Sequence, residues 1–404
     1  MTAFLTSIRP VKQVATLAGA AMVACICVSP ATGQETYRVA PGPAIDWSVL
    51  ARLTETFRLD ANRRLNDDND GVEASGVIGL GLTVSGRGKR TRFNVATGFR
   101  AGRSTDNTVS NLDRIDPNIR ATAAFLGKGY SINASANART GATSTIELED
   151  TGVTNLNATR FDAGASVGVN WQATKRDALS LTTTAQFVDF SRSVGSLRPS
   201  QTFGISGGWT RQATPTTSYS FTTTFRHFES DGAGGRTSRT ASGRFGIQHR
   251  RTSRHSLGGS AGVSVVSTER DNGDDTTQIG FVGGGTFGYS IDEFSASLNL
   301  NQAIRPSSDG DLNAFTALNG TLRYRINSLE SLNFSIRYTR RSDISGGGDV
   351  LQFLSLGPTY SYSLSKDSSL SLSYQFRLRD DETNDLEAGH QVMLRLSHEL
   401  TLLQ

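Results

Sequence analysis

The strongest constraint that this sequence places on its fold is an alternation of apolar and polar residues that returns in segment after segment. In SLSLSYQFRLR at 369–379, leucine, tyrosine and phenylalanine alternate with serine, glutamine and arginine. The segments FDAGASVGVNW at 161–171, FSASLNLN at 294–301 and SLNFSIRYTR at 331–340 follow the same period. Because successive side chains of a β-strand point to opposite faces, a period of two predicts strands with one apolar and one polar face.

Short and long connections between the strand-like segments alternate along the chain. Short turn-like segments, such as GKG at 127–129 and TKRD at 174–177, recur about every 35 to 47 residues. Longer segments rich in acids and glycine, such as NDDNDG at 66–71 and ERDNGDD at 269–275, lie between them. The count predicts about eighteen strands, with about sixteen as the alternative, joined by about nine long loops and about eight short turns.

Strand length separates a membrane barrel from other all-β folds. Each repeat holds two strands of about ten to fourteen residues, whereas a propeller blade packs four short strands into a similar length. A tilted transmembrane strand needs about 9 to 11 residues, and a sheet in lipid must close because no edge can stay unpaired. The sequence therefore predicts an all-β fold, a closed antiparallel transmembrane β-barrel at 49–404, with its first strand near 49–59 and its last near 391–402.

The N-terminus has the composition of an export signal. Arg9 and Lys12 precede an apolar run that begins near Val14, and small residues follow the run up to Gly33. We predict a signal peptide at 1–33, cleaved after Gly33, and a short periplasmic segment at 34–48.

Both cysteines, Cys25 and Cys27, lie inside this apolar run. Cleavage after the run predicts a mature chain with no disulfide and no cysteine metal site. Attachment of lipid at Cys25 is the alternative interpretation.

With this signal, the alternation and the unequal connections, the chain resembles the bacterial outer-membrane β-barrel porins over 49–404. The resemblance implies a location in the bacterial outer membrane, contact with its lipid and lipopolysaccharide, and insertion by the barrel assembly machinery. In that family the last strand usually ends in an aromatic residue, whereas this chain ends in Leu403 and Gln404. The oligomeric state stays open.

Motifs that look catalytic fall within alternating segments. GISGG at 204–208 fits the nucleophile pattern G-x-S-x-G, and GGGTFG at 283–288 fits the dinucleotide pattern G-x-G-x-x-G. Both patterns need a helix after the motif, yet the alternation continues through them. Among five histidines, His227 has Glu229 and Asp231 nearby. The alternation places His227 on the same strand face as neighbouring aromatic residues, away from the polar face. We predict no enzyme activity, no catalytic residues and no cofactor.

The charge of the chain argues against nucleic acid as a partner, and the acidic loops raise the question of metal binding. A formal net charge of +4 is too small to indicate a nucleic-acid-binding protein. The acidic loops lack the twelve-residue spacing of a calcium loop with its final glutamate. Solvated loops without a metal site are expected, with weak binding of divalent ions as the alternative.

The alternation places many arginines on the polar face, toward the lumen. Because closure makes the last strands neighbours of the first, we expect the arginines from both ends of the chain to form one basic wall. These are Arg52, Arg58, Arg92, Arg100, Arg120, Arg139, Arg323, Arg325, Arg337, Arg377, Arg379 and Arg395, joined by Arg226 and Arg244 from the middle of the chain.

The longest predicted loop, at about 140–159, is the third on the long-loop side. In the porins that this chain resembles, the third loop folds into the lumen and narrows it. The resemblance implies that role for Glu147, Glu149 and Asp150, with a position on the surface as the alternative.

A barrel of about eighteen strands leaves an aqueous channel unless something fills it. A basic wall in a confined lumen favours anions, so we predict a porin-like channel for passive diffusion of small hydrophilic, preferentially anionic solutes. The resemblance extends to eighteen-stranded exporters of anionic polysaccharides, so export of an acidic exopolysaccharide is one alternative. A non-conducting surface or adhesion barrel is the other.

Overall fold

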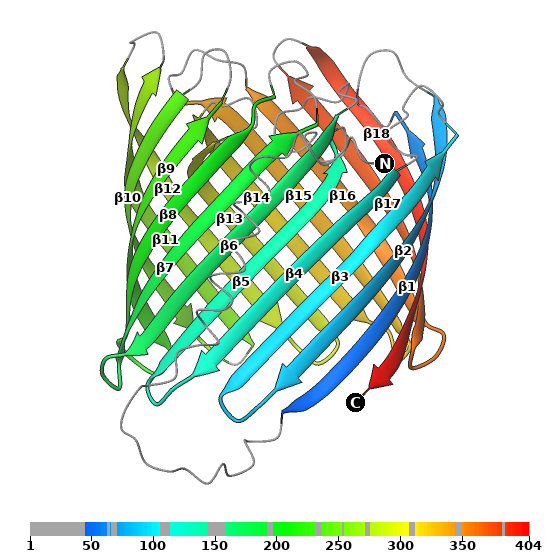
Figure 1. Ribbon diagram of the computed structural model, residues 1–404, viewed down its shortest axis with the longest axis horizontal. Helices are drawn as coiled ribbons and strands as arrows, with labels where there is room; N and C mark the ends of the chain where they lie inside the picture. Colours follow the sequence, from blue (N-terminus) through cyan, green and yellow to red (C-terminus); the bar gives the residue numbers. More distant parts are fainter. Residues whose placement is uncertain are drawn as a thin grey trace, which may run out of the picture.

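A single closed sheet makes up the part of the chain that the computed structural model describes, which is 45–62, 65, 71–105, 114–143, 158–191, 197–231, 236–252, 254–270, 275–306, 312–344, 350–381 and 384–403. Each of its eighteen strands pairs antiparallel with its neighbours in sequence. The last strand also pairs with the first, so the sheet closes into a barrel (Figure 1). Within the described ranges, no helix is long and apolar enough to cross a membrane.

The strands have the following bounds in chain order. They are β1 Asp46–Ala61, β2 Val72–Arg87, β3 Thr91–Ser104, β4 Arg114–Leu126, β5 Tyr130–Ala142, β6 Thr159–Gln172, β7 Asp177–Phe190, β8 Ser200–Gln212, β9 Thr217–Ser230, β10 Arg236–Arg250, β11 His255–Arg270, β12 Thr276–Ser290, β13 Phe294–Pro306, β14 Leu312–Arg325, β15 Glu330–Asp343, β16 Leu351–Ser363, β17 Ser368–Asp381 and β18 Asn384–Leu403.

The connections confirm the predicted asymmetry and strand count. β2 ends at Arg87 and β3 begins at Thr91, whereas β5 ends at Ala142 and β6 begins only at Thr159. The start of β1 and the end of β18 both lie at the short-turn end of the barrel (Figure 1). The predicted closed antiparallel barrel is confirmed. Its first and last strands are longer than expected, because Asp46–Ser48 continue the ladder with β2 and the first residues of β18 continue the ladder with β17.

Register assigns each strand residue to one of two faces, because residues paired across strands point to the same side. In β11 and β12, Val263 and Val265 align with Phe281 and Ile279, and all four side chains are exposed. Ser264 between them aligns with a glycine on the opposite face. Exposed large apolar residues occupy one face of strands around the barrel. Such a surface suits contact with lipid.

Aromatic rings collect on this outer face near the short turns. Trp47 packs edge-on against Phe93, with ring centroids 4.7 Å apart. Tyr219 stacks on Phe245 at 6.1 Å, and Trp171 is exposed near the end of β6. Rings at this depth form the girdle that outer-membrane barrels place at the membrane interface.

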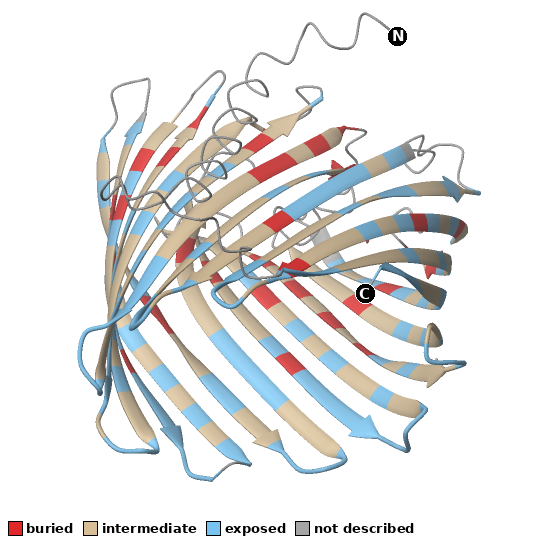
Figure 2. Ribbon diagram, turned by 60° about the horizontal axis from the view of Figure 1, so that its bottom comes forward, coloured by how far each residue is buried: buried red, intermediate tan, exposed pale blue. Residues whose placement is uncertain are grey.

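Buried residues lie mostly toward the long-loop end of the wall (Figure 2). One buried pair joins Leu65, just after β1, to Phe353 on β16. Another cluster joins Val266, Val282 and Ile304 from β11, β12 and β13. The barrel is therefore packed from within near this end.

One ladder is shorter than its strands. β12 and β13 pair only from Gly283 with Gln302 down to Ser290 with Ser295. Beyond that point β12 continues paired with β11, and β13 continues paired with β14. The two strands thus part toward the long-loop end.

Candidate pore lumen

A cavity of about 1280 Å³ crosses the inside of the barrel. Strands β4 to β9 line one side of it, and β13 to β15 line the other. Along β13 the cavity is lined by Asn299, Asn301, Ala303 and Arg305, which alternate as one face of a strand must, and by Pro306 at the end of the strand. The lumen face is thus the polar face that the sequence alternation defined.

The cavity is strongly basic. Six arginines line it, namely Arg120, Arg139, Arg160, Arg226, Arg305 and Arg337. Asp162 is the one acidic residue among its described lining residues. Arg139 Nε lies 3.2 Å from Asp162 Oδ2, and Arg160 Nη2 lies 2.8 Å from Asp162 Oδ1. Two guanidinium groups therefore already neutralise this single carboxylate.

The rest of the lining is rich in amides and hydroxyls. Asn319 Oδ1 accepts a hydrogen bond from Arg337 Nε at 3.3 Å, and Ser135 Oγ lies 2.8 Å from Ser166 Oγ. A second cavity of about 490 Å³ has Arg92 and several asparagines, serines and threonines in its lining. Such a surface offers donors and acceptors to a hydrated solute.

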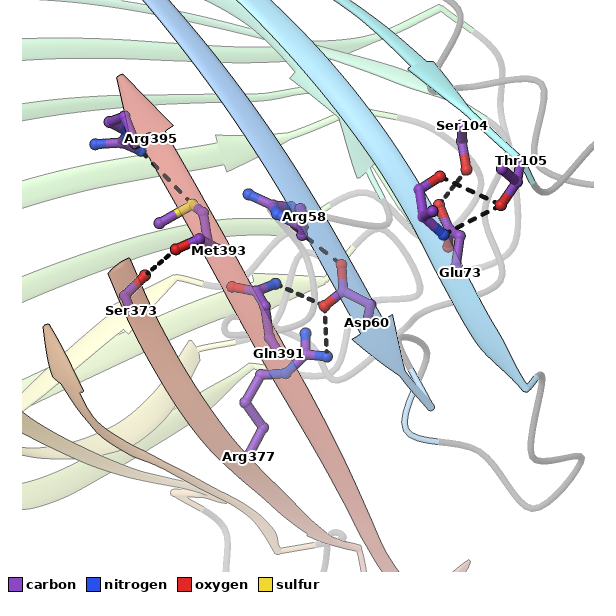
Figure 3. Close-up of polar contacts among 11 residues, drawn as sticks. Arg58, Asp60, Glu73, Ser104, Thr105, Ser373, Arg377, Gln391, Met393 and Arg395 are labelled. Atoms are coloured by element: carbon purple, nitrogen blue, oxygen red, sulfur yellow. Dashed lines mark hydrogen bonds and ion pairs between the residues drawn. The ribbon is translucent and has the colours of Figure 1, made fainter. Parts of the chain in front are cut away.

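A buried ion cluster lies where the barrel closes (Figure 3). Asp60 on β1 accepts hydrogen bonds from Arg377 Nη2 at 3.2 Å and from Gln391 Nε2 at 2.6 Å. Arg58 Nε lies 3.9 Å from the other carboxylate oxygen. The Asp60 side chain is only 1% exposed. The cluster ties β1, β17 and β18 together across the closure.

The backbone just after β1 packs onto the same wall. Leu65 is completely buried against Phe353, and its carbonyl accepts a hydrogen bond from Arg379 Nη1 at 3.3 Å. Asn62 Nδ2 donates to the carbonyl of Ala388 at 3.0 Å. Asn62 and Leu65 both have positive φ, at 48° and 50°. Non-glycine residues adopt this conformation only when packing compensates for the strain.

The predicted lumen arginines are distributed over several environments. Arg120, Arg139, Arg226 and Arg337 come together at the large cavity, and Arg92 lies at the smaller one. By register, Arg100, Arg244 and Arg323 share the lumen face with them.

The other predicted arginines are engaged within the wall. Arg58, Arg377 and Arg379 belong to the packing around Asp60 and Leu65. At the short-turn end, Arg52 pairs with Glu399 and Arg325 donates to the carbonyl of Asp292. Arg395 Nη2 lies 3.9 Å from Met393 Sδ (Figure 3).

Two cavity arginines did not emerge from the sequence. Arg160 lies at the start of β6 with the parity of Asp162, and Arg305 lies near the end of β13 with the parity of Asn301. Extending the alternation to the strand ends would have found both. Arg305 Cζ lies 3.3 Å from the centroid of the Phe315 ring. The predicted constriction residues Glu147, Glu149 and Asp150 lie outside the described residues.

The motifs that resemble catalytic sites are parts of strands. GISGG lies within β8, and GGGTFG lies within β12. Register places all five histidines on the outer face, where His390 Nδ1 lies 2.8 Å from Tyr374 Oη and His398 Nδ1 lies 2.7 Å from Ser368 Oγ. Among the described residues, no group of three or more histidine, cysteine or acidic side chains is arranged to hold a metal ion.

Comparison with known proteins bears on the fold. No protein-family model matches the chain, and no curated protein matches it. The structure of OccAB4 from Acinetobacter baumannii matches 89% of this chain and 100% of its own at 10% identity, with a TM-score of 0.50. The outer membrane protein OpdK from Pseudomonas aeruginosa matches 88% of this chain and 99% of its own at 11% identity, with a TM-score of 0.49. OpdK has also been crystallised with vanillate. At 10% identity the likeness to OccAB4 is one of fold, and at that level it confirms the predicted resemblance.

Proposed function

We propose that this barrel is a passive outer-membrane channel for small hydrophilic solutes and that it favours anions. The observation that carries the proposal is the large cavity, where six arginines face one carboxylate that two of them already contact. The apolar outer face supports a place in the membrane. The proposal includes removal of residues 1–33 on export and insertion by the barrel assembly machinery.

Anion preference follows from fixed charge in a confined space. Guanidinium groups stay protonated at any physiological pH, so the positive potential of the cavity is permanent. Low-dielectric walls focus that potential, which raises the local concentration of anions and lowers their barrier to entry. The asparagine and serine side chains exchange hydrogen bonds with a solute that keeps part of its hydration. Together these features favour carboxylated or phosphorylated small molecules over cations.

Planar-bilayer recording of the purified protein in a potassium chloride gradient tests the proposal. The zero-current potential should have the sign of chloride preference, and Arg337→Gln should reduce it. Arg239→Gln is the matched control, because Arg239 pairs with Glu269 on the outer face and is removed from the lumen. A potassium preference in the unaltered protein would refute the proposal. Block by an acidic oligosaccharide would instead indicate polysaccharide export.

A further inference from the structure

The end of β13 at 303–306, here called the β13 tip, lies inside the barrel wall. Ala303 and Arg305 line the large cavity, so Ile304 between them points away from it. Ile304 is nevertheless only 5% exposed, because it packs with Val266 and Val282. Its partners must therefore lie behind the tip as seen from the cavity.

Those partners belong to the lumen face of β11 and β12. Arg226 lines the cavity and aligns with Thr240, which aligns in turn with Val266. Val282 and Gly280 share this face, since they align with Gly262 and Ser264. A side chain of the tip thus rests on the inner surface of the neighbouring strands. The parting of β12 from β13 allows the tip to move inward over them.

A glycine makes room for this packing. A Cβ added to Gly280 would lie 2.5 Å from Ile304 Cδ1, closer than two carbon atoms can approach. Ser238, Ser264 and Phe228 on the same inner face are at most 2% exposed, as expected for a covered surface. The fit is therefore specific to this region of the wall.

Two arginines bind the backbone of the tip and of the residue before it. Arg244 Nη2 donates to the carbonyl of Gln302 at 3.4 Å, and Arg226 Nη1 donates to that of Ile304 at 3.2 Å. The two carbonyls are two residues apart, so they lie on one edge of β13. The ladder with β12 ends at the pair of Gly283 with Gln302, so Ile304 lies beyond its last pair. Pro306, which ends the strand, has no N–H to leave unpaired.

We propose that Arg226 and Arg244 are positioning residues that hold the β13 tip over the lumen face of β11 and β12, so that the tip narrows the pore and presents Arg305 to passing anions. The proposal rests on the proposed channel function and deepens it. The tip faces β4 to β7 across the large cavity, where Arg120, Arg139 and Arg160 lie. Arginines on both sides of the narrowing place the strongest positive potential where a solute has least water around it.

Exclusion of neutral polyethylene glycols of graded size from the open channel tests this role, because uncharged polymers respond to width and not to charge. Arg226→Gln with Arg244→Gln should admit larger polymers and raise single-channel conductance roughly twofold. Arg226→Lys with Arg244→Lys should restore part of the exclusion. Arg120→Gln is the control, since it removes charge from the same cavity without touching the tip: anion preference should fall while the size limit stays.

Gly280→Val gives a second variant that displaces the tip by volume alone. It should widen the channel in the same way, and folding of every variant is checked by the mobility of unheated samples in gels. An unchanged size limit in folded Gly280→Val and in the double glutamine variant overturns the proposal, as does a barrel that conducts in none of these forms. A channel that prefers cations but still widens would refute the proposed anion selectivity and leave the tip's role intact.

Discussion

At the scale of single residues, Glu55 stands out because it is a carboxylate on the outer face. Register aligns it with Ile78 on β2 and Leu396 on β18, and Leu53 and Phe57 flank it on its own strand. Its side chain is exposed among these apolar neighbours. A charge on the lipid face is unfavourable in a way that depends on depth. This position therefore weakens the barrel unless something covers it.

Replacing Glu55 with leucine should stabilise the barrel in lipid by about 1 to 2 kcal/mol, because acids cost less than the roughly 2 to 4 kcal/mol of a basic residue at mid-depth. Urea unfolding in lipid vesicles, followed by gel mobility, measures the change. Glu55→Gln should fall between the two. Loss of stability in Glu55→Leu would mean that the carboxylate makes a favourable contact, as at a subunit interface.

Asp60 is the opposite case, a buried carboxylate with several partners. Asp60→Asn should destabilise the barrel by about 2 to 3 kcal/mol, because it leaves buried guanidinium charge at the closure less compensated. The same urea titration applies. Asp46→Asn, an exposed position on the same strand, should be neutral within about 0.5 kcal/mol. Equal effects at the two positions would show that the cluster contributes nothing to closure.

At the scale of elements, the alternation predicted the strands well because lipid outside and water inside impose it on every strand. Arg120 and Arg337, which the alternation places on the lumen face, line the large cavity. The alternation could not predict that β12 and β13 stop pairing toward the long-loop end. That feature depends on Ile304 meeting Gly280 and on Arg226 reaching a carbonyl far along the chain. Contacts of this kind leave no period in the sequence.

Two glycines of β11 show how closely the backbones of β10 and β11 approach each other. A Cβ added to Gly262 would lie 2.0 Å from the carbonyl oxygen of Gly243, whereas one added to Gly259 meets nothing within 4 Å. Gly262→Ala should therefore cost about 1 to 3 kcal/mol through overpacking, and Gly259→Ala should be close to neutral. Thermal unfolding in detergent compares the two. Equal stability would mean that the strands can separate at little cost.

At the scale of the whole molecule, closure and charge act together. β18 must meet β1 for the lumen to exist, and the Asp60 cluster that joins them uses arginines that would otherwise add to the lumen charge. The cavity arginines come from β4, β5, β6, β9, β13 and β15, so they lie on both sides of the path and do not form a single wall. The ion selectivity of such a pore arises from the combined electrostatic potential of its arginines more than from any one contact.

A summed field predicts a steep dependence of selectivity on salt. The electrostatic screening length falls from about 10 Å at 0.1 M salt to about 3 Å at 1 M salt. The length at 1 M is short compared with the width of a solvated lumen. The ratio of chloride to potassium permeability should therefore fall toward one as the salt concentration rises at a constant gradient. Zero-current potentials at several mean concentrations measure this ratio. A preference that persists unchanged at 1 M would show that anions bind individual arginines at contact distance, and selectivity would then have to be assigned residue by residue.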